Sequence, residues 1–373
     1  MHVKPSLTLV FSCLMALTSI SNAKEIHAFI GTYSQTSSKG IYAVTLDLES
    51  GRLGPVSLAA EARDPSFLAY SPDLKSLYAI NESEGRIRSF SVGRDHTLRP
   101  LNDLPTDAGY PPDLAVDPSG RMIVSAIYGG GAVVGFPIMK NGSLGQRSAL
   151  IKHSGKSVNA SRQEAPHAHG VTFSKNGRFV VIPDLGIDQV KVYAVDAAKG
   201  GLAASAGDHL AIEPGSGPRH AVFSKDGKFL YVINELVSTI TVASFNEKTG
   251  GLKTLQTVGT LPAGFTGESS TAEIALHPGG RFIYGSNRGH DSIARFSRDD
   301  KSGRLTFLDT TPTGGRTPRH FAITPDGRWL VAANQDSDTL CVFRIDAKTG
   351  ALTATGSTAN VPRPVCVRFE SYP

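Results

Sequence analysis

Cysteine is scarce in this chain of 373 residues, which contains Cys13, Cys341 and Cys366. The sequence has no Cys-x-x-Cys or His-Glu-x-x-His spacing, so it predicts no metal site. Cys341 and Cys366 fall in different structural repeats, and we expect both to be small buried side chains. A disulfide between them is the alternative if the protein reaches an oxidising compartment.

A strong charge of one sign is missing as well. The chain has 38 Lys and Arg residues against 33 Asp and Glu residues, which gives a formal net charge of +5. The basic residues are scattered through turns and form no runs. We therefore expect neither nucleic acid nor an anionic membrane surface as a partner.

Long apolar runs are confined to the start of the chain. Leu7–Ile20 follows the basic residue Lys4 and precedes the small residues Ser21-Asn22-Ala23, an order typical of a signal peptide. The run is too short, and its flank too weakly charged, for a membrane anchor. We expect residues 1–23 to be removed, so that the mature protein starts at Lys24.

A lipoprotein signal that uses Cys13 is the alternative interpretation of the same residues. Phe11 fits poorly in such a signal, two residues before the cysteine. With a cleaved peptide, we expect a periplasmic or secreted protein that has no attachment to a membrane after cleavage.

What the sequence does contain is a repeat. Gly217–Glu235 (GPRHAVFSKDGKFLYVINE) has the pattern of a β-hairpin with a turn at Lys225–Gly227 and a second strand rich in aromatic and β-branched residues. Related hairpins recur about every 50 residues, and regular recurrence at this spacing is typical of propellers. The repeat anchors are Pro72, Pro118, Lys175, Lys225, Pro278 and Pro325.

Each repeat predicts four strands, an inner hairpin and then an outer hairpin closed by a turn with glycine and leucine. An aromatic residue marks the third strand of successive repeats, at Phe90, Phe136, Tyr193, Phe245, Phe296 and Phe343. The C-terminal segment Pro362–Phe369 repeats the first inner strand a seventh time, and its missing partners are the strands at the start of the mature chain. We therefore predict an all-β fold, one seven-bladed β-propeller over residues 24–373, closed by pairing of the two chain ends.

The repeat also predicts which side chains meet. Arg219 and Glu235 are equally distant from the turn at Gly227, so they should lie side by side at one mouth of the central channel. The residues in phase with Arg219 are Ser66, Pro112, His169, Ala272, Arg319 and Arg363. Those in phase with Glu235 are Glu82, Tyr128, Leu185, Arg288 and Gln335. These residues differ from blade to blade, as expected where one asymmetric ligand binds.

Several residues at or near these repeat positions have a structural interpretation as well as a functional one. We expect the residues one position before the Glu235 phase to cap hairpin ends by hydrogen bonds from side chain to backbone. They are Asn81, Asp184, Asn234, Asn287 and Asn334. His220 and His320 recur in one motif and are expected to be structural. The pair His167 and His169 has no counterpart in other blades, and both interpretations stay open. Glu235 and Arg288 form either a structural ion pair or part of an acid/base site.

Four motifs occur in order along the chain: Ala165–Gly170 (APHAHG), Gly217–His220 (GPRH), Asn234-Glu235 and Ser286–Arg288 (SNR). Together they resemble the seven-bladed propeller lactonase family, over essentially the whole mature chain. Its best-known activity is 6-phosphogluconolactonase, and a fungal carboxymuconate-cyclising enzyme shares the fold. The resemblance implies an active site made of Arg219, Glu235 and Arg288 with either His167 or His169.

Hydrolysis of a lactone requires an activated water, stabilisation of the oxyanion and protonation of the leaving alkoxide. We expect Glu235 or the His167/His169 pair to act as the base. Arg219 and Arg288 would stabilise the oxyanion or hold an anionic group of the substrate. No serine lies in a nucleophile-elbow motif, which favours direct attack by water, and no cofactor is expected.

Five further residues are candidates for substrate binding: Glu82, Asp184, Glu273, Arg319 and Gln335. We expect a monomer whose partner is a small lactone. A muconate-type cycloisomerase and a propeller that binds a ligand without chemistry are the alternatives. The resemblance implies cytoplasmic enzymes for the phosphogluconolactonases of the family, whereas we predict that this chain is exported, so the phosphorylation state of the substrate stays open.

Overall fold

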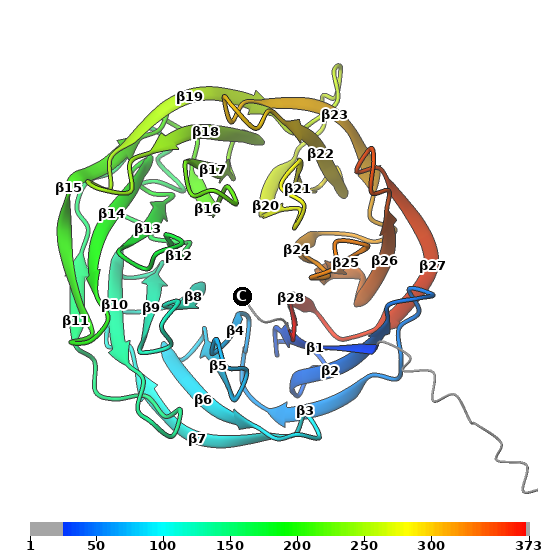
Figure 1. The fold of residues 1–373 in the computed structure, drawn as a ribbon, viewed down its shortest axis with the longest axis horizontal. Helices are drawn as coiled ribbons and strands as arrows, with labels where there is room; N and C mark the ends of the chain where they lie inside the picture. Colours follow the sequence, from blue (N-terminus) through cyan, green and yellow to red (C-terminus); the bar gives the residue numbers. More distant parts are fainter. Residues whose placement is uncertain (1–24, 371–373) are drawn as a thin grey trace, which may run out of the picture.

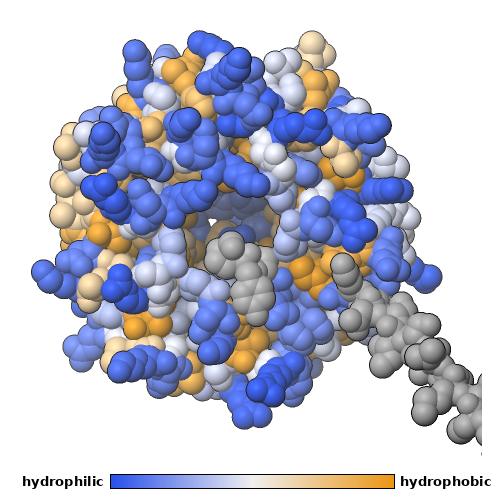
Figure 2. Space-filling view, in the orientation of Figure 1, coloured by the Kyte–Doolittle hydropathy of each residue, from blue (hydrophilic) through white to orange (hydrophobic). Residues whose placement is uncertain are grey.

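Seven four-stranded antiparallel sheets surround a central channel in the computed structural model, which describes residues 25–370 (Figure 1). The prediction of a closed seven-bladed propeller is confirmed. One face of the ring carries mostly hydrophilic side chains and is hollowed at its centre (Figure 2). Residues 1–23, where we predict a signal peptide, lie outside the described part of the chain. No helix among the described residues is long and apolar enough to cross a membrane.

Each blade takes four strands, numbered along the chain and ordered from the channel outward. The blade with both chain ends has β28 (Pro364–Phe369), β1 (Glu25–Thr32), β2 (Gly40–Asp47) and β3 (Ser57–Glu61). The next two have β4 (Leu68–Tyr70), β5 (Ser76–Asn81), β6 (Arg86–Val92) and β7 (Leu98–Pro105), then β8 (Asp113–Val116), β9 (Met122–Ile127), β10 (Ala132–Pro137) and β11 (Ala149–Lys152).

The fourth blade has β12 (Thr172–Phe173), β13 (Phe179–Asp184), β14 (Gln189–Asp196) and β15 (Gly201–Ala211), and the fifth has β16 (Pro218–Phe223), β17 (Phe229–Asn234), β18 (Thr239–Phe245) and β19 (Leu252–Gly259). The sixth has β20 (Ser270–Leu276), β21 (Phe282–Arg288), β22 (Ser292–Arg298) and β23 (Leu305–Pro312). The last has β24 (Pro318–Ile323), β25 (Trp329–Asn334), β26 (Thr339–Ile345) and β27 (Leu352–Asn360), with a 3₁₀ turn, η1 (Gln335–Ser337).

The inner hairpin of the fifth blade shows why these residues form these elements. In its turn, the Asp226 carboxylate accepts hydrogen bonds from the Ser224 hydroxyl at 2.6 Å and from the Lys228 amide at 3.2 Å. Gly227 has φ 73°, which glycine adopts without steric cost. The following strand β17 is buried at every residue, because its sheet packs between two neighbouring sheets.

Neighbouring blades are joined by a repeated polar contact. A buried aromatic side chain in the second strand of one blade donates a hydrogen bond to a carbonyl in the outer turn of the next blade. The pairs are Tyr78–Gly142 at 3.0 Å, Tyr231–Gly303 at 3.0 Å, Tyr284–Gly350 at 2.7 Å and Trp329–Leu48 at 3.0 Å. The outer turns with glycine thus connect blades as well as strands.

The ring closes where β28 pairs antiparallel with β1, with Ala28 opposite Phe369 and Ile30 opposite Val367. β28 also packs against β24 and β4 on the two adjacent blades. Cys366 on β28 and Cys341 on β26 are both buried and free, as expected. The innermost strand of this blade therefore comes from the opposite end of the chain from its three partners.

Deleting Pro362–Pro373 should abolish the cooperative thermal transition, because β1 loses its partner and two adjacent blades lose packing against β28. Circular dichroism during heating measures this. A chain ending at Glu370, which keeps β28, is the matched control and should melt like the full chain. Wild-type melting of the larger deletion would refute closure by β28.

Candidate active site

Short irregularities at the start of the inner strands direct side chains into the channel. In the pairing of β16 with β17, Pro218 faces Asn234 and His220 faces Ile233, which leaves Arg219 as an extra residue in a β-bulge. A bulge reorients its side chain relative to simple strand alternation. The same shift occurs at Arg319, between Pro318 and His320. We call the end of the channel at these bulges the Arg219 mouth.

Glu235 is the centre of a buried ion cluster at the Arg219 mouth. Its Oε2 lies 3.0 Å from Nε of Arg219 and 3.2 Å from Nη2 of Arg288. Its Oε1 accepts a hydrogen bond of 2.6 Å from Nη2 of Arg162. The predicted proximity of Arg219 and Glu235 is confirmed, and Arg288 on the next blade does reach the same carboxylate. One buried carboxylate therefore holds three arginines from separate parts of the chain.

The charges in this cluster, together with burial, set the protonation states of Glu235 and Arg219. Burial by itself would raise the pKa of Glu235, but the guanidinium groups of Arg288, Arg219 and Arg162 outweigh it and lower this pKa to about 2. Burial and the neighbouring Arg319 and Arg288 lower the pKa of Arg219 to about 10. Glu235 is thus ionised and the arginines are charged at neutral pH.

One guanidinium N–H group at this mouth has no partner among residues 25–370. Arg219 donates from Nη1 to the Ala272 carbonyl at 2.7 Å, and Arg288 donates from Nη2 to the Thr271 carbonyl at 2.7 Å. The buried Nε of Arg219 lies 3.0 Å from the Glu235 carboxylate, whereas the buried Nε of Arg288 makes no hydrogen bond. A guanidinium with such a donor suits an oxyanion.

The two histidines of the APHAHG motif differ in their surroundings. His167 has both ring nitrogens engaged, at 3.0 Å from the Tyr128 carbonyl and 3.1 Å from the Glu164 carboxylate. His169 is 5% exposed, and its Nδ1 has no hydrogen-bond partner in the described chain. Burial and the charge of Arg219 lower the pKa of His169 well below its ordinary value, so its imidazole is neutral.

A polar recess adjoins Arg219. Glu82 accepts hydrogen bonds from the hydroxyl of Tyr33 at 2.9 Å and from that of Ser66. The guanidinium carbon of Arg319 lies 5.3 Å from the centre of the Tyr33 ring, and no carboxylate of residues 25–370 is within 4.0 Å of its nitrogens. The recess holds about 10 Å³, room for roughly one water molecule.

Two residues predicted to bind substrate lie elsewhere, and these expectations are corrected. Asp184 is fully buried and acts as an anchor, since it accepts the His167 amide at 2.7 Å and lies 2.6 Å from His153. Glu273 is turned by a one-residue bulge toward the opposite end of the channel. The side-chain nitrogen of Gln335 donates to the Asp336 carboxylate at 3.0 Å, its Oε1 is buried without a partner among residues 25–370, and its role in binding stays a prediction.

Arg162 was not anticipated from the sequence. It lies on the irregular connection between β11 and β12, where no repeat phase applies. The neighbouring Gln163 pins this connection by donating to the Leu185 carbonyl and to Asp188, both at 2.8 Å. The spacing from Pro118 to Lys175 is the longest between repeat anchors, and this excess length was the available signal.

No group of three or more His, Cys, Asp or Glu side chains within residues 25–370 is arranged to hold a metal ion. The polar groups of the Arg219 mouth are instead arginines, two carboxylates and a neutral histidine. Such a set can bind an anion and polarise a carbonyl.

Glu235→Gln should remove a pH-dependent part of the stability. Folding lowers the pKa of Glu235 from 4.5 to about 2, so the carboxylate stabilises the fold above pH 4.5 and this contribution is lost as the pH falls through 2. We expect a deficit of about 3 kcal/mol in the free energy of unfolding at pH 7. Urea unfolding at several pH values should show the deficit shrinking between pH 4.5 and 2.

Glu247→Gln, which changes an exposed carboxylate, is the control and should stay within about 0.5 kcal/mol of wild type. A deficit in Glu235→Gln that does not change with pH would contradict the assignment of an ionised, arginine-held carboxylate.

Comparison with known proteins identifies the family of this chain. The family model for lactonases with a seven-bladed β-propeller matches residues 27–369. The 6-phosphogluconolactonase of Bacillus subtilis is 36% identical over 344 residues, which cover 91% of this chain and 97% of the relative. The structure of the periplasmic gluconolactonase of Pseudomonas aeruginosa superposes with a TM-score of 0.87 at 32% identity, covering 94% of this chain and 100% of that one.

A protein from Lactobacillus plantarum, also of known structure, is 31% identical with a TM-score of 0.87, covering 93% of this chain and 100% of that one. These matches span nearly all of the described residues, so they include the blades that supply Arg219, Glu235 and Arg288. They confirm the resemblance carried by the four sequence motifs, and the chain belongs to the lactonase family of seven-bladed β-propellers.

Proposed function

We propose that this protein hydrolyses a sugar lactone at the Arg219 mouth. The observation that carries this proposal is the excess of positive charge there. Four arginines, Arg162, Arg219, Arg288 and Arg319, lie with two carboxylates, Glu82 and Glu235. Lactone hydrolysis develops negative charge on the carbonyl oxygen and releases a carboxylate, and an excess of arginines favours both.

The bound lactone lies above the recess beside Arg219, because the recess itself is too small for a sugar. Its carbonyl oxygen faces the guanidinium groups of Arg288 and Arg219, whose positive charge stabilises the oxyanion formed on attack, and the unpartnered Nε–H of Arg288 is the donor for it. Arg162 is partly exposed and covers Glu235 from the solvent side, so it is placed to contact the substrate as well.

Of the two candidates for the base, His169 is better placed than Glu235. The Glu235 carboxylate is occupied by three arginines at 2.6–3.2 Å, so we assign it to positioning the arginines rather than to accepting a proton. His169 is neutral and has a free ring nitrogen, whereas both nitrogens of His167 are engaged. A proton gained by His169 is stabilised by the oxyanion that forms beside it.

Hydrolysis then proceeds in two steps. The oxygen of water bonds to the lactone carbonyl carbon while His169 accepts one proton. The carbon–oxygen bond of the ring then breaks, and the leaving alkoxide takes that proton from His169 to give the hydroxy acid. Water is the only co-reactant that this sequence of steps consumes.

The alternatives gain less support. The Bacillus subtilis and Pseudomonas aeruginosa relatives are named for lactone hydrolysis, and neither name refers to cyclisation. Their names differ in whether the gluconolactone is phosphorylated. Because we predict a signal peptide and the second relative is periplasmic, we propose export and an unphosphorylated sugar lactone as the substrate class.

Assays with a panel of glucono-, 6-phosphoglucono- and muconolactones test the proposal, with His169→Asn as the key variant. We expect turnover of a sugar lactone by the wild type and a loss of about 10²-fold or more in kcat for His169→Asn, the scale for a positioned base. His209→Asn, on the outer strand β15, is the matched control and should be unaffected. Wild-type turnover by His169→Asn would return the role of base to Glu235, and a wild type inactive on every sugar lactone would refute the proposal.

Mass spectrometry of protein made in its native host tests the export. The expected mature chain begins at Lys24, because Leu7–Ile20 and Ser21-Asn22-Ala23 have the order of a cleaved signal. An intact Met1 in a cytoplasmic fraction would refute export and favour the phosphorylated lactone.

A further inference from the structure

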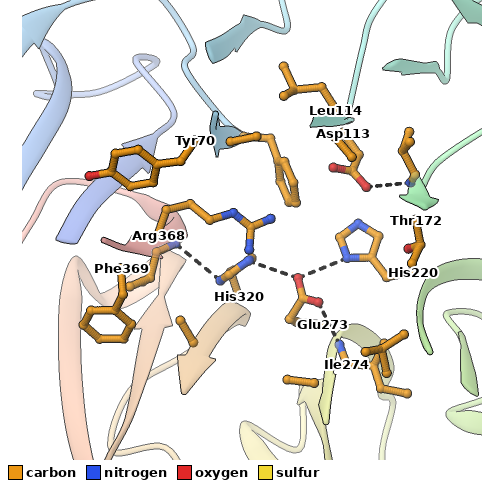
Figure 3. A pocket seen from close by; sticks show the side chains of 18 of the residues that line it. Tyr70, Asp113, Leu114, Thr172, His220, Glu273, Ile274, His320, Arg368 and Phe369 are labelled. Carbon is orange, nitrogen blue, oxygen red and sulfur yellow. Dashed lines mark hydrogen bonds and ion pairs between the residues drawn. The ribbon is translucent and has the colours of Figure 1, made fainter. Parts of the chain in front are cut away.

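The end of the channel opposite the Arg219 mouth holds a second chamber, where a few polar side chains lie among apolar ones (Figure 3). We call it the turn chamber, since the inner hairpin turns at Ser71–Pro72 and Pro118 line it. Its volume of about 620 Å³ is in the range of small-molecule sites. Phe67, His220 and His320 line both the chamber and the recess beside Arg219, so they separate the two spaces.

Arg368 on β28 presents a free cation to this chamber. Its Nε donates to the Leu68 carbonyl at 2.8 Å, and its guanidinium carbon lies 4.5 Å from the centre of the Phe67 ring. Within residues 25–370, its side chain has no carboxylate within 4.0 Å and makes no other hydrogen bond. The two terminal nitrogens are therefore free to bind a carboxylate in the planar fork that arginine prefers.

Asp113 on β8 is a second unsatisfied group. It is 4% exposed, and its Oδ2 accepts the Val171 amide at 2.8 Å. Its Oδ1 is buried and has no partner in the described chain, which is costly for a group of this kind. Burial raises the pKa of Asp113 well above its ordinary value, which favours the protonated form, a hydrogen-bond donor as well as an acceptor.

Glu273, His220 and His320 also line the chamber, and both histidines contact the Glu273 carboxylate. Oε2 of Glu273 lies 3.1 Å from Nδ1 of His220 and 3.2 Å from Nε2 of His320. Nδ1 of His320 accepts the Val367 amide at 3.3 Å, so its proton is on Nε2, toward Glu273. With Glu273 held in this way, Arg368 is the cation that an incoming anion meets.

We propose that the turn chamber binds a small hydroxy acid, with its carboxylate on the terminal nitrogens of Arg368 and a hydroxyl group on Oδ1 of Asp113. Small side chains such as Ala115, Ala221 and Ala322 leave the chamber wide enough for a six-carbon chain. A hydroxy acid is also what lactone hydrolysis releases. That the occupant is the reaction product rests on the proposed function, whereas the complementarity of the chamber to a hydroxy acid does not.

Calorimetric titration with sodium D-gluconate tests the proposal on the mature protein. An Arg288→Ala background weakens anion binding at the Arg219 mouth, so that the chamber is measured by itself. We expect gluconate to bind this background and Arg368→Gln to weaken the binding by about tenfold or more. Arg344→Gln, which changes an exposed arginine on β26, is the matched control and should bind like the background. Equal affinity with and without Arg368 would overturn the proposal.

Additional variants distinguish the remaining outcomes of the gluconate titration. If Arg368→Gln fails to show a wild-type melting curve, Asp113→Ala, which removes the hydrogen-bonding oxygen, decides in its place, and unchanged gluconate affinity there overturns the proposal. Gluconate binding that requires removal of residues 371–373 also overturns it, since the occupant is then the chain's own end. Arg368→Gln alone should keep lactone turnover within about twofold of wild type. Arg368-dependent gluconate binding by a protein that hydrolyses no lactone would support the chamber and refute only the proposed function.

Discussion

The antiparallel pairing of β28 with β1 is the constraint on which the rest of the molecule depends. It joins the first and last segments of the described chain into one blade, and it leaves no inner strand of the ring without a partner. Only in a closed ring do side chains from different blades converge on one axis. Arg219, Arg288 and Glu235 meet because the fifth and sixth blades are held at a fixed angle by blades on both sides. The repeated contacts from Tyr78, Tyr231, Tyr284 and Trp329 to outer turns maintain that angle.

Bulges convert this regular scaffold into a chemical site. A regular strand would send Arg219 and His220 to opposite faces, but the bulge between Pro218 and His220 allows both side chains to line the channel. One faces the Arg219 mouth and the other reaches the turn chamber. The bulge between Thr271 and Ile274, which also adds one residue, does the same for Glu273. Consecutive residues of the same strand thus supply side chains to the two opposite ends of the channel.

Electrostatics distinguishes the two ends. Glu235 is surrounded by three arginines and Glu273 by two histidines, so each buried carboxylate stays ionised by a different means. Buried ion pairs contribute little net stability, because desolvation offsets much of the attraction. The arginines at one mouth are therefore better explained by the anion that we propose they bind than by the fold they stabilise. The neutral state of His169 follows from its burial and from the same positive field.

The sequence by itself determined the ring and the part of the site that obeys its repeat. Hairpin period, turn residues and the unpaired C-terminal segment were enough to predict seven blades, because each blade buries the same pattern. Equal distance from a turn was enough to place Arg219 beside Glu235. Tertiary structure alone decided the rest. Glu273 faces the turn chamber because a β-bulge changes the direction in which its side chain points. Asp184 is unavailable to a substrate because His153 and the His167 amide occupy its carboxylate oxygens. Arg162 lies on a connection outside the repeat, so its position could not be predicted from the repeat pattern. Its contact with Glu235 on the fifth blade brings it to the site.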